Sequence, residues 1–194
     1  MKKSGIFHLI REDKNKYSLP NFFTFLRLVL LPFIIYFLLK GTRAGDVSAL
    51  LLMLLAAFTD YLDGHFARQL DQTSDVGRMM DPLIDKLSVG ATMFALAHVK
   101  GLPYWYVAIV IARDVFLLVT GTLVISKKRF VVESNKIGKW TSTILAMVII
   151  SFTLNIPHIK YIFMYSSLVL IPFTVVGYVR KYKYDLRLQA NKER

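Results

Sequence analysis

Apolar residues along this chain are gathered in long runs that are separated by short polar and charged connections. Several runs reach the roughly 20 residues that a helix needs to cross a hydrocarbon core about 30 Å thick. The pattern therefore predicts an all-α polytopic membrane protein with six transmembrane helices. The predicted spans are Leu19–Leu39, Val47–Phe66, Pro82–His98, Pro103–Ser126, Trp140–Ile156 and Tyr161–Tyr178.

The spans also divide the chain into segments. Residues 19–179 form the predicted six-helix domain, residues 1–18 a cytoplasmic N-terminal segment and residues 180–194 a basic cytoplasmic tail. Within residues 1–18, Ile6–Ile10 is predicted to form a short helix on the membrane surface. We expect no removable signal peptide, because this segment lacks a contiguous apolar stretch and a small-residue cleavage site.

Composition and charge narrow the class of protein further. Hydrophobic residues make up 55% of the 194 residues, and the absence of cysteine excludes disulfides, thiol nucleophiles and thiolate metal sites. The net charge of +12 is compatible with nucleic-acid binding, but the basic residues lie between the apolar runs. That distribution indicates contact with anionic membrane lipids, and no nucleic-acid partner is expected.

The basic residues are divided unequally between the two sides that six spans define. Most lie with the two termini, and the other side carries only Lys40, Arg43, Lys100 and Lys160. Cytoplasmic loops carry an excess of Lys and Arg, so we place both termini in the cytoplasm. The expected location is the bacterial inner (plasma) membrane, with the active site on the cytoplasmic side.

Four aspartates stand at the facing ends of the second and third spans: Asp60, Asp63, Asp81 and Asp85. Spacings of three and four return to one face of a helix, about one turn apart. Two antiparallel helices joined on the cytoplasmic side would bring these carboxylates together near the membrane surface. Four such anions would repel one another or take up protons, so we predict one or two divalent cations. Ligation by oxygen alone favours Mg²⁺, Mn²⁺ or Ca²⁺ over zinc.

A metal site of this kind suits a substrate that contains a diphosphate, because paired ions can hold the phosphates and stabilise the leaving group. Gly64 directly follows Asp63, and Gly77 precedes Asp81 by four residues, so a bulky substrate could approach the helix backbone. Arg68 adds a guanidinium that could bind phosphate.

Residues 60–85 read DYLDGHFARQLDQTSDVGRMMDPLID, which matches D-x2-D-G-x2-A-R-x8-G-x3-D-x3-D at every fixed position. This is the signature of the CDP-alcohol phosphotransferases, and the chain resembles that family throughout its length. The resemblance implies transfer of a phosphatidyl group from CDP-diacylglycerol to an alcohol, with release of CMP. It also implies a role in phospholipid biosynthesis and assembly as a homodimer.

The resemblance further implies roles for individual residues. Asp60, Asp63 and Asp81 would hold two Mg²⁺ or Mn²⁺ ions, with Asp85 close by as a further ligand and as the general base on the acceptor hydroxyl. The residues that would lie along the CDP moiety are Asp63, Gly64, Ala67, Arg68 and Ser74.

Asn21, Thr24 and Arg27 recur every three residues on the first span, after Pro20. The stretch is similar to the LPN-xx-T-xx-R start of the family, which favours a polar stripe facing the nucleotide and assigns Asn21 and Thr24 to CDP binding. The alternative is a helix start followed by an arginine whose side chain reaches up to the membrane surface.

Further basic residues are candidates for binding the acceptor. Arg113 and Asp114 lie in the middle of the fourth span, and adjacent residues do not share a helix face, so we do not expect a simple intrahelical pair. We predict that Arg113 binds an acceptor phosphate; the alternative is that it only neutralises the aspartates. Lys136 and Lys139, at the start of the fifth span, are predicted to bind the acceptor or, alternatively, to signal topology only.

Other kinds of function stay open at this point. Intramembrane charges also mark transporters and channels, although here they gather at one membrane face. A membrane prenyltransferase or a small scaffold are further alternatives. The acceptor is ambiguous as well: the segment LPNFFTFLR resembles phosphatidylglycerophosphate synthases, which use sn-glycerol 3-phosphate, whereas ARDVFLL is closer to CMP-forming cardiolipin synthases, which use phosphatidylglycerol. We favour glycerol phosphate.

Overall fold

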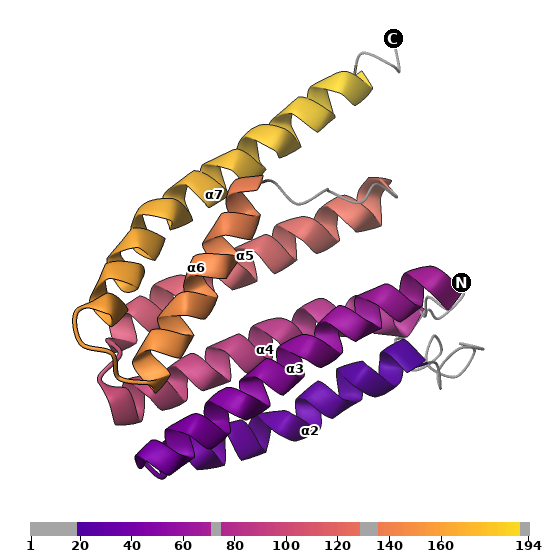
Figure 1. Ribbon diagram of the computed structural model, residues 1–194. Coiled ribbons are helices and arrows are strands. Elements are labelled where there is room, and N and C mark those ends of the chain that lie inside the picture. Colours follow the sequence, from indigo (N-terminus) through magenta and orange to yellow (C-terminus); the bar gives the residue numbers. More distant parts are fainter. Residues whose placement is uncertain (1–18, 71–74, 129–135, 191–194) are drawn as a thin grey trace. The chain divides into compact units, whose positions relative to one another are not determined.

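The computed structural model describes residues 19–70, 75–128 and 136–190 and, within them, the side chains of Phe23 and of residues 25–62, 82–120 and 138–180. Every element in these ranges is a helix, which confirms the all-α prediction (Figure 1). The helices are α2 (Leu19–Leu39), α3 (Arg43–Leu70), α4 (Asp75–Lys100), α5 (Tyr104–Lys128), α6 (Lys136–Thr153) and α7 (Ile159–Ala190). The predicted surface helix at Ile6–Ile10 lies outside the described residues.

The chain divides into two compact units, Met1–Gly101 with α2 to α4 and Leu102–Arg194 with α5 to α7.

The bounds of several helices differ from those of the predicted spans. Helix α2 coincides with its predicted span, whereas α3 and α4 continue past theirs into the polar connection. The aspartates therefore lie inside the helices and not at their ends, because backbone hydrogen bonds continue where the apolar run has stopped. Helix α7 likewise continues to Ala190, through most of the predicted tail.

Two segments of the described helices are long and apolar enough to cross a membrane by length and composition alone. They are Arg43–Leu62 in α3 and Ile159–Arg180 in α7. Phe25–Leu39 in α2 forms a shorter apolar helix. Six spans thus remain a prediction at this level, and six helices are what the described residues show.

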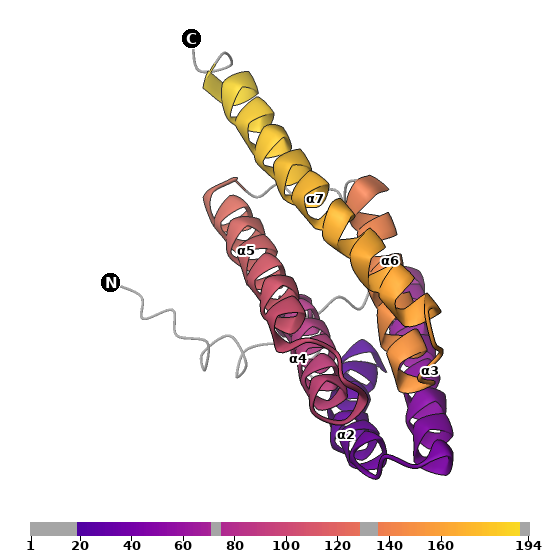
Figure 2. The ribbon, with the colours of Figure 1, turned by 90° about the vertical axis from the view of Figure 1, so that its left-hand side faces the viewer.

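In the first unit, α2 packs against both α3 and α4, and Figures 1 and 2 show it running alongside them. The buried residues Leu30, Leu31, Ile34 and Leu38 follow one another at spacings of one, three and four and form the apolar stripe of α2. Successive helices reverse direction, so the start of α2, the end of α3 and the start of α4 lie at the same end of this unit (Figure 1).

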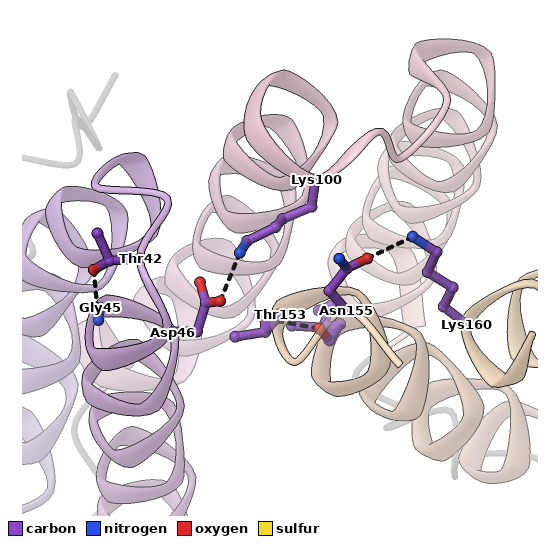
Figure 3. Close-up of polar contacts among 8 residues, drawn as sticks. Thr42, Gly45, Asp46, Lys100, Thr153, Asn155 and Lys160 are labelled. Carbon is purple, nitrogen blue, oxygen red and sulfur yellow. Dashed lines mark hydrogen bonds and ion pairs between the residues drawn. The ribbon is translucent and has the colours of Figure 1, made fainter. Parts of the chain in front are cut away.

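The turn from α2 to α3 fixes these two helices close together. Gly41 adopts a φ of 62°, the left-handed conformation that commonly ends a helix. Thr42 then caps α3, since its Oγ1 accepts a hydrogen bond of 3.1 Å from the amide of Gly45 (Figure 3). A Cβ atom on Gly45 would lie 2.6 Å from the carbonyl oxygen of Phe37, so only glycine permits this approach of the two backbones.

In the second unit, α7 packs against α6 and contacts α5. Its interior contains two buried pairs of hydroxyl groups: Tyr106 with Ser167 at 2.6 Å, and Thr141 with Thr174 at 2.7 Å. Such pairs satisfy polar atoms that would otherwise be costly to bury, and they link helices within the unit.

The turn from α6 to α7 explains why α6 ends at Thr153 and not at the predicted Ile156. Asn155 and His158 both have positive φ values, 50° and 64°, which break the helix. Asn is among the residues that tolerate this conformation best. Its Oδ1 accepts a hydrogen bond of 2.7 Å from Nζ of Lys160, which closes the turn (Figure 3).

Candidate active site

The centre of the candidate site is a buried arginine on α2. Arg27 is only 7% exposed and continues the stripe of Leu30, Leu31 and Ile34 toward the start of the helix. Because α2 packs against both α3 and α4, a side chain on this stripe can reach both neighbours. The burial of Arg27 argues against the alternative that its side chain reaches up to the membrane surface.

Arg27 joins one aspartate from each neighbouring helix. Its Nη1 lies 2.7 Å from Oδ1 of Asp60 on α3. The same nitrogen donates a hydrogen bond to Oδ1 of Asp85 on α4. The carboxylates of Asp60 and Asp85, 25 residues apart in the sequence, thus meet at a single guanidinium nitrogen.

The acidic segments of α3 and α4 were predicted to meet. The contact shows this for one aspartate of each helix, Asp60 and Asp85. The side chains of Asp63 and Asp81 lie outside those described. Their backbones are helical, in α3 and α4 respectively. They stand one helical turn from Asp60 and Asp85, toward the connection between the two helices.

The three residues differ in charge and in exposure. One guanidinium, that of Arg27, faces the two carboxylates of Asp60 and Asp85. The side chains of Asp60 and Asp85 are 55% and 45% exposed, while Arg27 is buried beneath them. Both carboxylates are therefore within reach of solutes.

In the second unit, Arg113 and Asp114 are both buried on α5, at 5% and 6% exposure. Nη1 of Arg113 lies 2.5 Å from Oδ1 of Asp114, so the two do form an intrahelical ion pair. The pair forms although adjacent positions do not share a helix face, because the long side chain of arginine can fold back to its neighbour. Nε of Arg113 has no hydrogen-bond partner within the described part of the chain.

Comparison with known proteins decides the family. The family model for CDP-alcohol phosphatidyltransferase matches residues 17–173, most of the chain. The chain belongs to the CDP-alcohol phosphatidyltransferase family. It is therefore an enzyme, a transferase of phospholipid biosynthesis, and the transporter, prenyltransferase and scaffold alternatives fall away.

Relatives within the CDP-alcohol phosphatidyltransferase family carry two kinds of name. The chain is 31% identical to a CDP-diacylglycerol–glycerol-3-phosphate 3-phosphatidyltransferase of Aquifex aeolicus over 176 residues, which is 84% of this chain and 95% of that protein. It is 31% identical to the protein of the same name in Bacillus subtilis over 178 residues, which is 83% of this chain and 91% of that protein. A CMP-forming cardiolipin synthase of Streptomyces coelicolor is 35% identical over 105 residues, 53% of this chain and 49% of that protein.

The other site residues that the CDP-alcohol phosphatidyltransferase signature predicts fall mostly on the same end of the first unit. Asn21 and Thr24 lie in the first turns of α2, and Gly64, Ala67 and Arg68 lie in the last turns of α3. The side chains of these five residues and all of Ser74 lie outside the described part. In the second unit, α6 begins at Lys136, whose side chain is not described, and Lys139 is exposed.

The residues present fit the divalent metal that the family implies. Asp60 and Asp85 offer oxygen atoms from two helices, and these already share one cationic group. Oxygen ligands of this kind suit Mg²⁺ or Mn²⁺. Among the side chains that the structure describes there is no group of three acidic or histidine ligands, and a complete set would need Asp63 or Asp81.

Sequence reasoning missed the contact of Arg27 with the acids. It placed this residue on a stripe facing the nucleotide, because the spacing of Asn21, Thr24 and Arg27 shows which residues share a face but not what that face contacts. The signal that was available is the position of Arg27: it is the one cation inside the first predicted span. A buried cation in such a place needs an anionic partner.

Proposed function

We propose that this protein transfers the phosphatidyl group of CDP-diacylglycerol to sn-glycerol 3-phosphate, which yields phosphatidylglycerophosphate and CMP. The observation that carries the proposal is that Asp60 and Asp85, the first and last residues of the family signature, meet at Arg27 of α2. The choice of acceptor is supported by coverage. The relatives named for glycerol 3-phosphate align over 95% and 91% of their length, whereas the cardiolipin synthase aligns over 49%.

The proposed setting is a membrane, crossed by six helices, with both termini and the active site in the cytoplasm of a bacterium. The described surface is apolar in a way that supports lipid contact: large side chains such as Phe25, Leu51, Phe58, Ile162 and Val169 are more than half exposed. A soluble monomer rarely exposes so much apolar surface. The homodimer implied by the resemblance stays a prediction.

In the proposed mechanism, Asp60, Asp63, Asp81 and Asp85 would hold two Mg²⁺ or Mn²⁺ ions. These ions, when bound, supply positive charge that neutralises the diphosphate and the departing CMP. Asp85 accepts the proton of the acceptor hydroxyl. At the same time the hydroxyl oxygen forms a bond to phosphorus, and the bond from phosphorus to CMP breaks. The 45% exposure of Asp85 supports this role, because a base has to be reachable by its substrate.

The remaining residues position the two substrates. Asn21, Thr24, Asp63, Gly64, Ala67, Arg68 and Ser74 would bind the CDP moiety. Arg113, Lys136 and Lys139 would bind the phosphate of glycerol 3-phosphate, for which a guanidinium offers two parallel hydrogen bonds. Holding both substrates in line accounts for most of the catalysis in transfers of this type.

The test is an assay with purified protein in detergent or nanodiscs. Labelled CDP-diacylglycerol and Mg²⁺ or Mn²⁺ are supplied with glycerol 3-phosphate, phosphatidylglycerol, inositol phosphate or serine in separate reactions. The expected lipid product is phosphatidylglycerophosphate, formed with one CMP per turnover and abolished by EDTA. Formation of cardiolipin would show that the acceptor is phosphatidylglycerol and not glycerol 3-phosphate. Absence of CMP with every acceptor would contradict the proposal.

A further inference from the structure

We propose that Arg27 is a built-in counterion that holds Asp60 and Asp85 together in the metal-free protein and competes with divalent ions for these two carboxylates. This inference rests on the metal site of the proposed function. It assigns to the first helix a part in setting metal affinity, beyond any contact of that helix with the nucleotide.

The first support is the geometry of the contact. One nitrogen, Nη1 of Arg27, approaches Oδ1 of both Asp60 and Asp85. These two aspartates come from helices that both pack against α2. A cation at this point replaces the repulsion between two neighbouring carboxylates with two attractive contacts, so it stabilises the approach of α3 to α4 before any metal binds.

The second support is the charge and burial of the three residues. Arg27 is buried, whereas both carboxylates are about half exposed. One guanidinium nitrogen faces two carboxylates, whose oxygen atoms are the ligands that a divalent ion prefers. The ion has to bind oxygen atoms that Arg27 already contacts, and the two positive groups repel each other at that distance.

The two possible roles of Arg27 predict opposite signs when its charge is removed. If Arg27 only preorganises the aspartates, its loss leaves them apart and metal binds more weakly. If Arg27 competes, its loss removes a positive charge from the place where the ion binds, and metal binds more tightly. The competition that we propose therefore has a signature that a purely structural role does not produce.

The experiment measures Mn²⁺ binding by electron paramagnetic resonance of the free ion, with purified full-length protein and no substrate. We expect Arg27→Gln to bind Mn²⁺ at least about tenfold more tightly than the wild type, since one nearby positive charge has been removed. We also expect the variant to melt at a lower temperature than the wild type in EDTA, and to gain more thermal stability from added Mn²⁺.

Lys100→Gln is the matched control. Lys100 is a buried cation of the same unit, and it bonds Asp46 at 2.6 Å at the other ends of α3 and α4. Its loss is expected to lower the melting temperature and to leave Mn²⁺ affinity unchanged. Arg27→Lys keeps the charge and is expected to stay within about threefold of wild-type affinity, because the repulsion depends mainly on charge.

The outcomes separate this inference from the proposed function. Unchanged or weaker Mn²⁺ binding by Arg27→Gln overturns the competition and leaves the transfer reaction untouched. An equal increase in Mn²⁺ affinity in Lys100→Gln also overturns the competition, since the effect would then not be local to Asp60 and Asp85. If the wild type binds no Mn²⁺, or if the variant Asp60→Asn has the same Mn²⁺ affinity as the wild type, the metal site of the proposed function is itself contradicted.

Discussion

Nζ of Lys100 lies 2.6 Å from Oδ2 of Asp46, and the two side chains are only 9% and 10% exposed (Figure 3). The pair joins the end of α4 to the start of α3, at the end of the first unit away from Arg27. Breaking a buried ion pair leaves one charge without its partner. We expect Lys100→Met to lower the free energy of unfolding by about 3–5 kcal/mol. Thermal or denaturant unfolding in detergent, followed by circular dichroism, measures the change.

Two comparisons make this prediction specific. The double variant Asp46→Leu with Lys100→Met should recover most of the lost stability, because no charge is then buried. Lys160→Met removes a hydrogen bond to Asn155 in an exposed turn, and it should cost less than about 1 kcal/mol. Equal losses in Lys100→Met and Lys160→Met would show that the Asp46 pair contributes little.

The hydroxyl pair between α5 and α7 predicts unequal effects of its two partners. Oγ of Ser167 donates to the carbonyl oxygen of Met164, so it can accept the hydrogen bond from Tyr106. Tyr106→Phe leaves Ser167 bonded and should cost about 0.5–1.5 kcal/mol. Ser167→Ala leaves the buried phenol of Tyr106 without this partner and should cost about 1–3 kcal/mol. The reverse order in unfolding experiments would contradict the assigned direction of the hydrogen bond.

Sequence patterns predicted the helices well and their ends less well. Helix α2 starts and stops where the apolar run does, with Pro20 in its first turn and Gly41 just past its end. The ends of α3 and α4 could not be predicted from hydropathy, because polar residues continue a helix beyond the apolar run. The early end of α6 depends on positive φ values at Asn155 and His158, which hydropathy does not report.

The candidate site was predictable to a similar degree. The spacing of the aspartates predicted that α3 and α4 would bring acids together, and Asp60 and Asp85 do meet. The contact of Arg27 with both carboxylates was not predicted, since a sequence shows the periodicity of a helix but not which neighbour each face contacts. The pairing of Arg113 with Asp114 was missed because the helical-face argument considers backbone positions and not the length of the arginine side chain.

Asp85→Asn tests the assignment of the general base. The amide keeps the shape of the side chain and an oxygen that can accept from Arg27, but it cannot take a proton from the acceptor hydroxyl. We expect kcat to fall at least about 100-fold, even at a saturating concentration of Mg²⁺ or Mn²⁺. Release of CMP at saturating substrate, over a range of pH, measures this.

The control for Asp85 is Asp46→Asn, the same substitution at a buried aspartate at the other end of α3. It should lower stability but leave kcat within about twofold for protein that is still folded, since the ion pair of Asp46 is structural. Near-wild-type turnover in Asp85→Asn, confirmed by a cooperative melting transition, would remove Asp85 from the role of base.

Arg113→Lys tests the predicted contact with the acceptor. Both residues carry a positive charge and can neutralise Asp114, but only the planar guanidinium can bind a phosphate through two parallel hydrogen bonds. The salt bridge of 2.5 Å holds Arg113 through Nη1, which fixes the orientation of the whole group. We therefore expect the KM for glycerol 3-phosphate to rise about tenfold, while the KM for CDP-diacylglycerol stays constant. If Arg113 served only to neutralise Asp114, lysine would leave both KM values unchanged, and a rise in both together would indicate a general distortion of α5.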